Sequence, residues 1–233
     1  MSESKQLLLD LALRAAFGRD DFLVAPSNAA AVKLIDDWPN WPTRVALLVG
    51  PEGSGKSHLA TVWQNRSKAP AVALENLTVE AVPLLLVAGG LAIEHTEGSR
   101  FNETALFHTL NQARQQNAQI LLTSRIEPLL WGVKLPDLAS RLKAIPFVRI
   151  EAPDDALLRG VLVKLFADRQ IKVDEPLVNY MLARMPRSLA AARSLVMAID
   201  AQSMVEKAEI TRPFVGRVMA SRESPDLFNV DEA

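Results

Sequence analysis

The chain has 233 residues, 26 lysines and arginines against 27 aspartates and glutamates, and no cysteine. Without cysteine there are no disulfides, no thiolate catalysis and no cysteine-ligated zinc. The balanced charge gives no electrostatic case for tight binding of duplex DNA, which favours a basic face. The apolar run near the N-terminus is broken by Asp10 and Arg14 and has no signal-peptide pattern. We therefore expect a cytoplasmic protein with no membrane segment.

The first two thirds of the chain alternate between apolar runs and helical spacing. Residues 1–21 are expected to form a flexible tail, and a helix is predicted at Asn28–Asp36. The run Arg44–Val49 predicts a buried strand, which leads through a glycine-rich loop into a helix near Lys56. Further strands are predicted at Ala71–Leu74, Pro83–Val87, Gln119–Thr123 and Pro146–Ile150, with helices at Glu103–Gln116 and Leu135–Leu142. This order predicts an α/β domain over residues 22–152, with a parallel sheet flanked by helices.

After Pro153 the strand signal disappears. Asp154 and Asp155 occupy positions where acids favour the start of a helix. Helical apolar spacing then continues through Asp154–Arg169, Glu175–Arg184, Arg187–Ala201 and Thr211–Ala220. We expect a small all-helical domain over residues 153–221 and a loose C-terminus over residues 222–233.

The segment Gly50–Ser57 satisfies the phosphate-loop pattern G-x-x-x-x-G-K-[ST] at every fixed position. Glycines let consecutive backbone N–H groups turn toward phosphate oxygens, and the next helix offers unpaired amides at its start. Lys56 would neutralise the outer phosphates, and the Ser57 hydroxyl would hold Mg²⁺. The nucleotide-binding residues expected here are Gly50, Pro51, Glu52, Gly53, Ser54, Gly55, Lys56, Ser57 and His58. The sequence thus predicts a site for ADP or ATP.

A phosphate loop that hydrolyses its nucleotide usually needs an acid at the end of a second strand. The candidate strand Pro83–Val87 is followed by small residues, Ala88–Gly90. Glu75 and Glu151 follow other strands and are interpreted as solvated charges, and Glu94 comes several residues after the candidate strand. We therefore expect weak or absent hydrolysis and a weakly held Mg²⁺.

Several segments resemble the AAA+ module of the DnaA family, and more closely its shorter Hda-like members. The resemblance covers about residues 5–220. It is carried by the segment before the first helix, a helix and the sensor 1 strand, the arginine-finger helix and the start of a lid helix. These are Asp21–Asn28, Glu103–Phe107, Leu121–Arg125, Leu135–Leu142 and Pro186–Leu189.

The resemblance implies specific roles. Arg141 would be an arginine finger presented to ATP held by DnaA, where a planar cation stabilises charge on the transferred phosphoryl group. Arg187 would contact nucleotide phosphates from the lid. Because the chain stops after the lid segment, we expect no helix-turn-helix domain and no sequence-specific DNA binding.

The N-terminal segment resembles the glutamine-led, leucine-rich peptides that dock on the replication sliding clamp, the beta subunit of DNA polymerase III. A mobile segment with closely spaced leucines can fill an apolar pocket on a partner. The residues expected to bind the clamp are Gln6, Leu7, Leu9, Asp10 and Leu11.

The leading hypothesis is a nucleotide-bound negative regulator of chromosomal replication initiation. It would dock on the clamp and stimulate ATP hydrolysis by DnaA. Two alternatives remain: an autonomous AAA+ ATPase, such as a helicase loader or remodeller, and an adaptor without nucleotide function. The sequence leaves open the choice between ADP and ATP, homo-oligomer formation, and whether Arg141 serves DnaA or a second copy of the chain.

Overall fold

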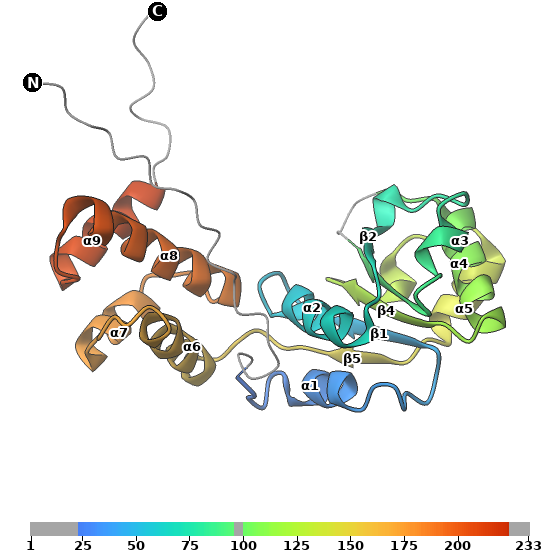
Figure 1. Cartoon of the computed structure of the whole chain (residues 1–233), viewed down its shortest axis with the longest axis horizontal. Coiled ribbons are helices and arrows are strands. Elements are labelled where there is room, and N and C mark those ends of the chain that lie inside the picture. Colours follow the sequence, from blue (N-terminus) through green and yellow to red (C-terminus); the bar gives the residue numbers. More distant parts are fainter. Residues whose placement is uncertain (1–22, 96–99, 224–233) are drawn as a thin grey trace, which may run out of the picture.

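Five short strands form one parallel sheet, which the computed structural model shows beside a separate group of helices (Figure 1). The structure describes residues 23–95 and 100–223. The strands are β1 (Val45–Val49), β2 (Ala71–Ala73), β3 (Gly90–Glu94), β4 (Gln119–Ser124) and β5 (Phe147–Arg149). Their order in the sheet is β2-β3-β4-β1-β5.

Helices cover both faces of this sheet. One face carries α1 (Ala29–Asp36) and α2 (Lys56–Ser67), and the other carries α3 (Val82–Leu85), α4 (Glu103–Gln115) and α5 (Pro136–Lys143). Among the described residues this domain also has two 3₁₀ turns, η2 (Leu74–Asn76) and η3 (Pro128–Leu130).

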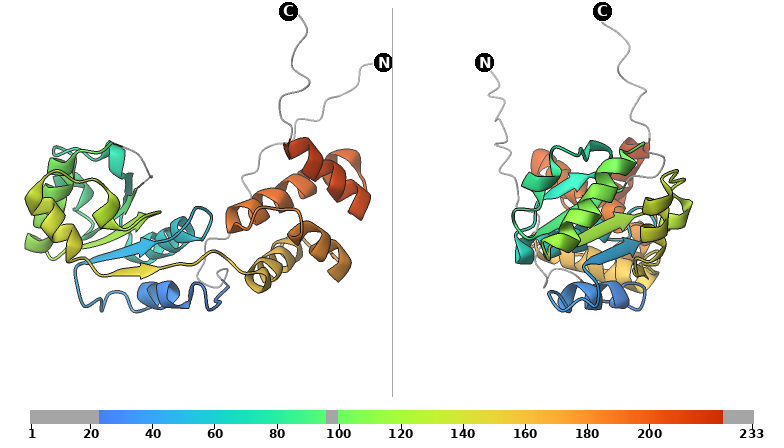
Figure 2. Two further views of the ribbon diagram at one scale, coloured as in Figure 1. Left: turned by 180° about the vertical axis from the view of Figure 1, so that it is seen from behind. Right: turned by 90° about the vertical axis from the view of Figure 1, so that its right-hand side faces the viewer.

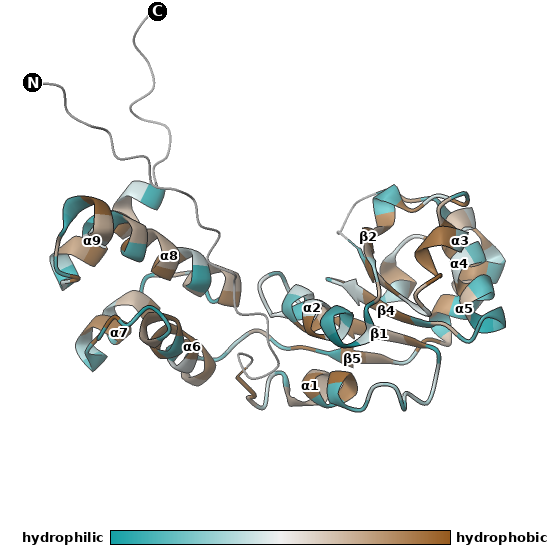
Figure 3. Ribbon diagram, in the orientation of Figure 1, coloured by the Kyte–Doolittle hydropathy of each residue, from teal (hydrophilic) through white to brown (hydrophobic). Residues whose placement is uncertain are grey.

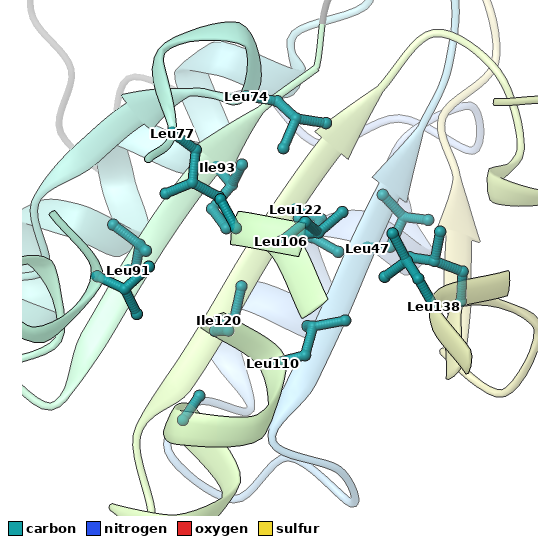
Figure 4. Packing of buried hydrophobic residues seen from close by; sticks show 14 of the residues in the cluster. Leu47, Leu74, Leu77, Leu91, Ile93, Leu106, Leu110, Ile120, Leu122 and Leu138 are labelled. Carbon is teal, nitrogen blue, oxygen red and sulfur yellow. The ribbon is translucent and has the colours of Figure 1, made fainter. Parts of the chain in front are cut away.

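Side-chain alternation along the strands creates a core on each face. In β1, Leu47 and Val49 pack under α4 and α5, whereas Ala46 and Leu48 pack under α1 and α2. Figure 4 shows strand and helix leucines and isoleucines meeting in the first of these cores, among them Leu91, Ile93, Ile120, Leu122, Leu106 and Leu138. A sheet buried on both faces explains why its central strands are almost wholly apolar.

The C-terminal helices build their own core. They are α6 (Asp155–Ala167), α7 (Glu175–Leu182), α8 (Leu189–Glu206) and α9 (Arg212–Glu223). Phe166, Met181, Val196 and Val215 are buried among them. Asp154, Asp174 and Ser188 accept hydrogen bonds from the first turns of α6, α7 and α8, which fixes where these helices begin. The rear view in Figure 2 shows these C-terminal helices as a separate group to one side of the α/β domain.

The expected architecture is confirmed: a parallel sheet flanked by helices, with a small all-helical domain after it. No helix in residues 23–95 and 100–223 has the length and apolarity to cross a membrane.

One strand prediction was wrong. Residues 82–85 form helix α3, not a strand over Pro83–Val87, and the strand begins at Gly90. A run of apolar residues this short does not distinguish a helix from a buried strand, and Pro83 fits the first turn of a helix. Leu84 and Val87 are 78% and 79% exposed, although Figure 3 colours this segment as apolar. The buried strand is therefore Gly90–Glu94, and it ends in a carboxylate.

Candidate nucleotide-binding site

The phosphate loop lies between the end of β1 and the start of α2, as its sequence predicts. The amide of Gly50 donates to the Ser124 carbonyl at 3.1 Å, which fixes the loop to the end of β4. A Cβ at Gly50 would lie 2.4 Å from the Ile150 carbonyl oxygen, so only glycine fits this crossing. Gly55 then precedes the first residue of α2. The result is a loop whose backbone leads into the amino end of a twelve-residue helix, the arrangement that binds phosphate in P-loop proteins.

Lys56 turns back over this loop. Its Nζ donates to the carbonyl oxygens of Gly50 and Pro51, each at 2.7 Å. Burial lowers the pKa of Lys56, and the charge of Arg125 lowers it further, while Glu52 and Glu94 oppose the change. Ser54 Oγ is buried and has no hydrogen-bond partner among the described residues. A cation and a buried hydroxyl at a glycine loop fit a polyphosphate.

The strand correction changes the interpretation of the metal site. Glu94 ends β3, and its Oε2 accepts a hydrogen bond from Ser57 Oγ at 3.5 Å. Glu94 therefore stands where a P-loop protein places the acid of its magnesium shell. The prediction that this acid is missing was wrong, because it counted from the incorrect strand. Ser57 and Glu94 supply two hard oxygen donors, a set that fits Mg²⁺ retaining water and phosphate ligands. Nowhere in the described residues do three histidine or acidic side chains gather as a metal cluster.

The next residue is not an acid. His95 is 7% exposed, and its ring lies 4.5 Å from the Trp131 ring and 5.6 Å from the Phe101 ring, measured between centroids. Burial lowers the pKa of His95, and the Glu75 carboxylate only partly opposes this. Burial in this aromatic pocket thus favours the uncharged ring. Because the residue after Glu94 is a histidine, no carboxylate directly follows Glu94 to activate water.

The lid reaches the phosphate loop through the start of α8. The Leu189 amide donates to the Gly53 carbonyl at 2.9 Å, and Arg193 Nη2 lies 3.1 Å from His58 Nδ1. Arg187 forms a bidentate ion pair with Asp155, at 2.8 and 3.2 Å. Its guanidinium is therefore held within the lid, two residues from the loop contact. The expected residues of the loop, His58 and the start of α8 come together at one place.

Arg141 lies elsewhere. It belongs to the last turn of α5, which precedes β5, whereas the phosphate loop follows β1. α5 packs on the face of the sheet that carries α4, whereas α2, into which the phosphate loop leads, packs on the opposite face. Figure 1 shows α5 at the end of the α/β domain farther from the lid. The Arg141 guanidinium carbon lies 5.1 Å from the centre of the Phe107 ring. The expected clamp-binding residues Gln6 to Leu11 lie outside the described residues.

Two charged residues at the site were not assigned to it from sequence. Glu94 was set aside through the strand error, although a glycine followed by Leu-Ala-Ile and then a carboxylate is a recognisable strand and acid. Arg125 follows β4, and its Nη2 lies 2.8 Å from Glu52 Oε2 in the phosphate loop. Its place after a buried strand was the available signal.

Comparison with known proteins finds similarity to the lid of Hda and to DnaA. Residues 155–219 match the family model "Hda, lid domain". The chromosomal replication initiator protein DnaA of Clavibacter sepedonicus is 21% identical over 252 residues, covering 96% of this chain and 51% of that protein. The chain thus spans about half the length of the curated DnaA relatives it matches.

Two solved structures resemble the fold. Domain III of Thermotoga maritima DnaA superposes with a TM-score of 0.71 at 17% identity, covering 88% of this chain and 96% of that one. AMPPCP-bound DnaA from Aquifex aeolicus gives 0.67 at 16% identity, covering 84% and 70%. The chain thus resembles Hda-like, DnaA-related proteins: its lid matches the Hda type, and the chain shares the fold of DnaA domain III.

Proposed function

We propose that this chain is an adenine-nucleotide-bound negative regulator of replication initiation that supplies Arg141 to ATP held by DnaA. The relative from Aquifex aeolicus binds AMPPCP, a triphosphate analogue, on the same fold. In this chain the phosphate loop, Lys56, Ser57 and Glu94 lie together, which supports Mg²⁺–nucleotide binding.

The observation that carries the proposal is the position of the helix that holds Arg141: α5 packs on the sheet face opposite α2, at the end of the α/β domain farther from the lid (Figure 1). An arginine on that helix is placed to serve a neighbouring molecule rather than the chain's own nucleotide. Phe107 lies under the guanidinium and favours one orientation of this cation. A preformed planar cation is what transition-state stabilisation in trans needs.

Clamp docking through Gln6, Leu7, Leu9, Asp10 and Leu11 is part of the proposal. It would concentrate the regulator on DNA-loaded clamps, where a second contact with DnaA becomes effectively intramolecular.

The test measures hydrolysis of DnaA-bound ATP with clamp-loaded DNA. Wild type should accelerate turnover, and Arg141→Ala should lose stimulation by about a hundredfold or more. Arg141→Lys should restore little, because an ammonium lacks the planar fork. Arg44→Ala is the matched control: Arg44 is an exposed arginine directly before β1, where it bonds Asn117. Full stimulation by Arg141→Ala would contradict the mechanism.

An autonomous AAA+ ATPase is the second candidate, and Glu94 near Ser57 is the observation that favours it. Against it stands His95, a buried histidine that occupies the next position, where an acid would be needed. Steady turnover by the purified chain alone, abolished by Glu94→Gln, would favour this candidate. We expect slow intrinsic turnover, because an acid to activate water does not follow Glu94.

A further inference from the structure

The helix that carries Arg141 has no capping side chain of its own. α5 has eight residues, and its N-cap position is Leu135, whose side chain offers no hydrogen-bond acceptor. Pro136 follows and has no backbone N–H to bond. Isolated helices of this length are marginal in water, so contacts from other elements determine where α5 begins.

Glu103 supplies the missing acceptor from another helix, since it is the first residue of α4. Its Oε2 accepts from the Leu135 amide at 2.7 Å and from the Lys134 amide at 3.0 Å, and its Oε1 also accepts from the Lys134 amide at 3.0 Å. Hydrogen bonds from backbone amides to a carboxylate are charge-assisted and stronger than those between neutral groups. One carboxylate thus holds the two amides immediately before α5.

α4 also contacts the other end of α5. Phe107 lies four residues after Glu103, so both side chains fall on one face of α4. The Phe107 ring centre lies 5.1 Å from the guanidinium carbon of Arg141, in the last turn of α5. Between these contacts, Leu138 and Leu142 of α5 are buried in the core that α4 helps to form. α4 therefore holds α5 at its start, along its buried side and at its arginine.

The contact at the start of α5 controls where the guanidinium lies. Arg141 follows Pro136 by five residues, about one and a half turns of helix, so a shift at the start is transmitted to the arginine. The leucine core resists such a shift poorly, because burial of apolar surface is not directional. A displacement of about 1 Å in a catalytic group can reduce a rate by about a hundredfold.

We propose that Glu103 is a positioning residue for Arg141: its carboxylate fixes the start of α5, so that the arginine meets the ATP of a neighbouring molecule in one orientation. The inference rests on the function proposed above and names a second residue that this function requires. Glu103 acts through α5 alone and contacts no nucleotide.

The experiment measures hydrolysis of DnaA-bound ATP with clamp-loaded DNA at increasing concentrations of the full chain. Glu103→Ala should lower the maximal stimulated rate by about tenfold or more, because the arginine is misplaced. The concentration for half-maximal stimulation should stay within about threefold of wild type, because the loss occurs in the transition state rather than in association. Glu103→Gln should keep the maximal rate within about threefold of wild type, since Oε2 alone accepts from both amides and glutamine retains one such oxygen.

Asn102→Ala is the matched control. Asn102 directly precedes Glu103 and accepts from the Ala105 amide at 3.0 Å, so this change removes a cap of α4 and leaves the bonds to α5 in place. Melting temperatures show how much each variant is destabilised, and only Glu103→Ala should lose stimulation. A wild-type maximal rate for Glu103→Ala, or equal losses in both variants, would overturn the positioning role.

Combination with Arg141→Ala separates this inference from the proposed function. In the Arg141→Ala background, Glu103→Ala should cause no further loss of stimulation, because it has no arginine left to position. A further tenfold loss, about the effect expected of Glu103→Ala alone, would show that Glu103 acts independently and would overturn the inference. Full stimulation by Arg141→Ala would remove the proposed function and this inference together. If Arg141→Ala is inactive and Glu103→Ala is fully active, the positioning role alone fails.

Discussion

The amide of Leu189 donates a hydrogen bond to the carbonyl oxygen of Gly53 at 2.9 Å. This bond places the first turn of lid helix α8 directly on the phosphate loop. Any change in the loop backbone on nucleotide binding must therefore be accommodated by the lid, which carries Arg187 at the same point of the chain. The contact links occupancy of the site to the position of the helical domain.

The approach at Gly53 leaves no room for a side chain. Gly53 has φ +71°, and a Cβ there would lie 1.9 Å from Ser188 Oγ. We expect Gly53→Ala to weaken nucleotide binding strongly and to lower the melting temperature, because it combines backbone strain with a displaced lid. Gly89→Ala is the matched control: Gly89 has φ +74°, but nothing lies within 4 Å of its added Cβ. If both variants bind nucleotide equally, the lid contact has no part in the site.

The strand that replaced the sequence prediction gives a second test. Leu91 in β3 is 0% exposed, whereas Leu84 in α3 is 78% exposed. Leu91→Ala should reduce the free energy of unfolding by about 2–5 kcal/mol through lost burial and a cavity. Leu84→Ala should change it by no more than about 0.5 kcal/mol. Chemical denaturation of both variants measures the difference. A larger loss of stability in Leu84→Ala than in Leu91→Ala would instead favour a buried strand at Pro83–Val87.

The sequence predicted what depends on local pattern. The eight residues Gly50–Ser57 located the phosphate loop, and alternating runs located four of the five strands and the lid helices. The error at Pro83–Val87 arose because leucines favour a short helix as readily as a strand, and only tertiary packing decides between them. Contacts such as Glu52–Arg125 join residues 73 positions apart, which a single sequence does not reveal.

Lys56 tests whether the loop binds nucleotide. Its Nζ bonds to two loop carbonyls at 2.7 Å, contacts that a phosphate would replace with stronger charge-assisted ones. In thermal unfolding, saturating ADP should stabilise wild type, by about 2.7 kcal/mol at a concentration one hundred times Kd. Lys56→Gln should unfold near the wild-type temperature without nucleotide and should gain little on adding ADP. A full ADP shift in this variant would exclude Lys56 from phosphate binding.

Glu94 tests the corrected metal site. If Ser57 and Glu94 share a magnesium ion, Mg²⁺ should tighten binding of an ATP analogue to wild type, and EDTA should abolish that gain. Glu94→Gln should reduce the Mg²⁺-dependent gain by about tenfold or more while leaving metal-free binding close to wild type, since a neutral amide is a poor Mg²⁺ ligand.

Glu75→Gln provides the control for general charge effects, because Glu75 lies in η2 after the edge strand β2, next to β3 in the sheet. If Mg²⁺ increases the affinity of Glu94→Gln for the ATP analogue as much as that of wild type, Glu94 is not a magnesium ligand and the site lacks its acid. If both variants lose the Mg²⁺-dependent increase in affinity, Mg²⁺ binding depends on the total negative charge near the site rather than on one ligand. Loss in Glu94→Gln alone is what the 3.5 Å hydrogen bond from Ser57 Oγ to Glu94 Oε2 predicts.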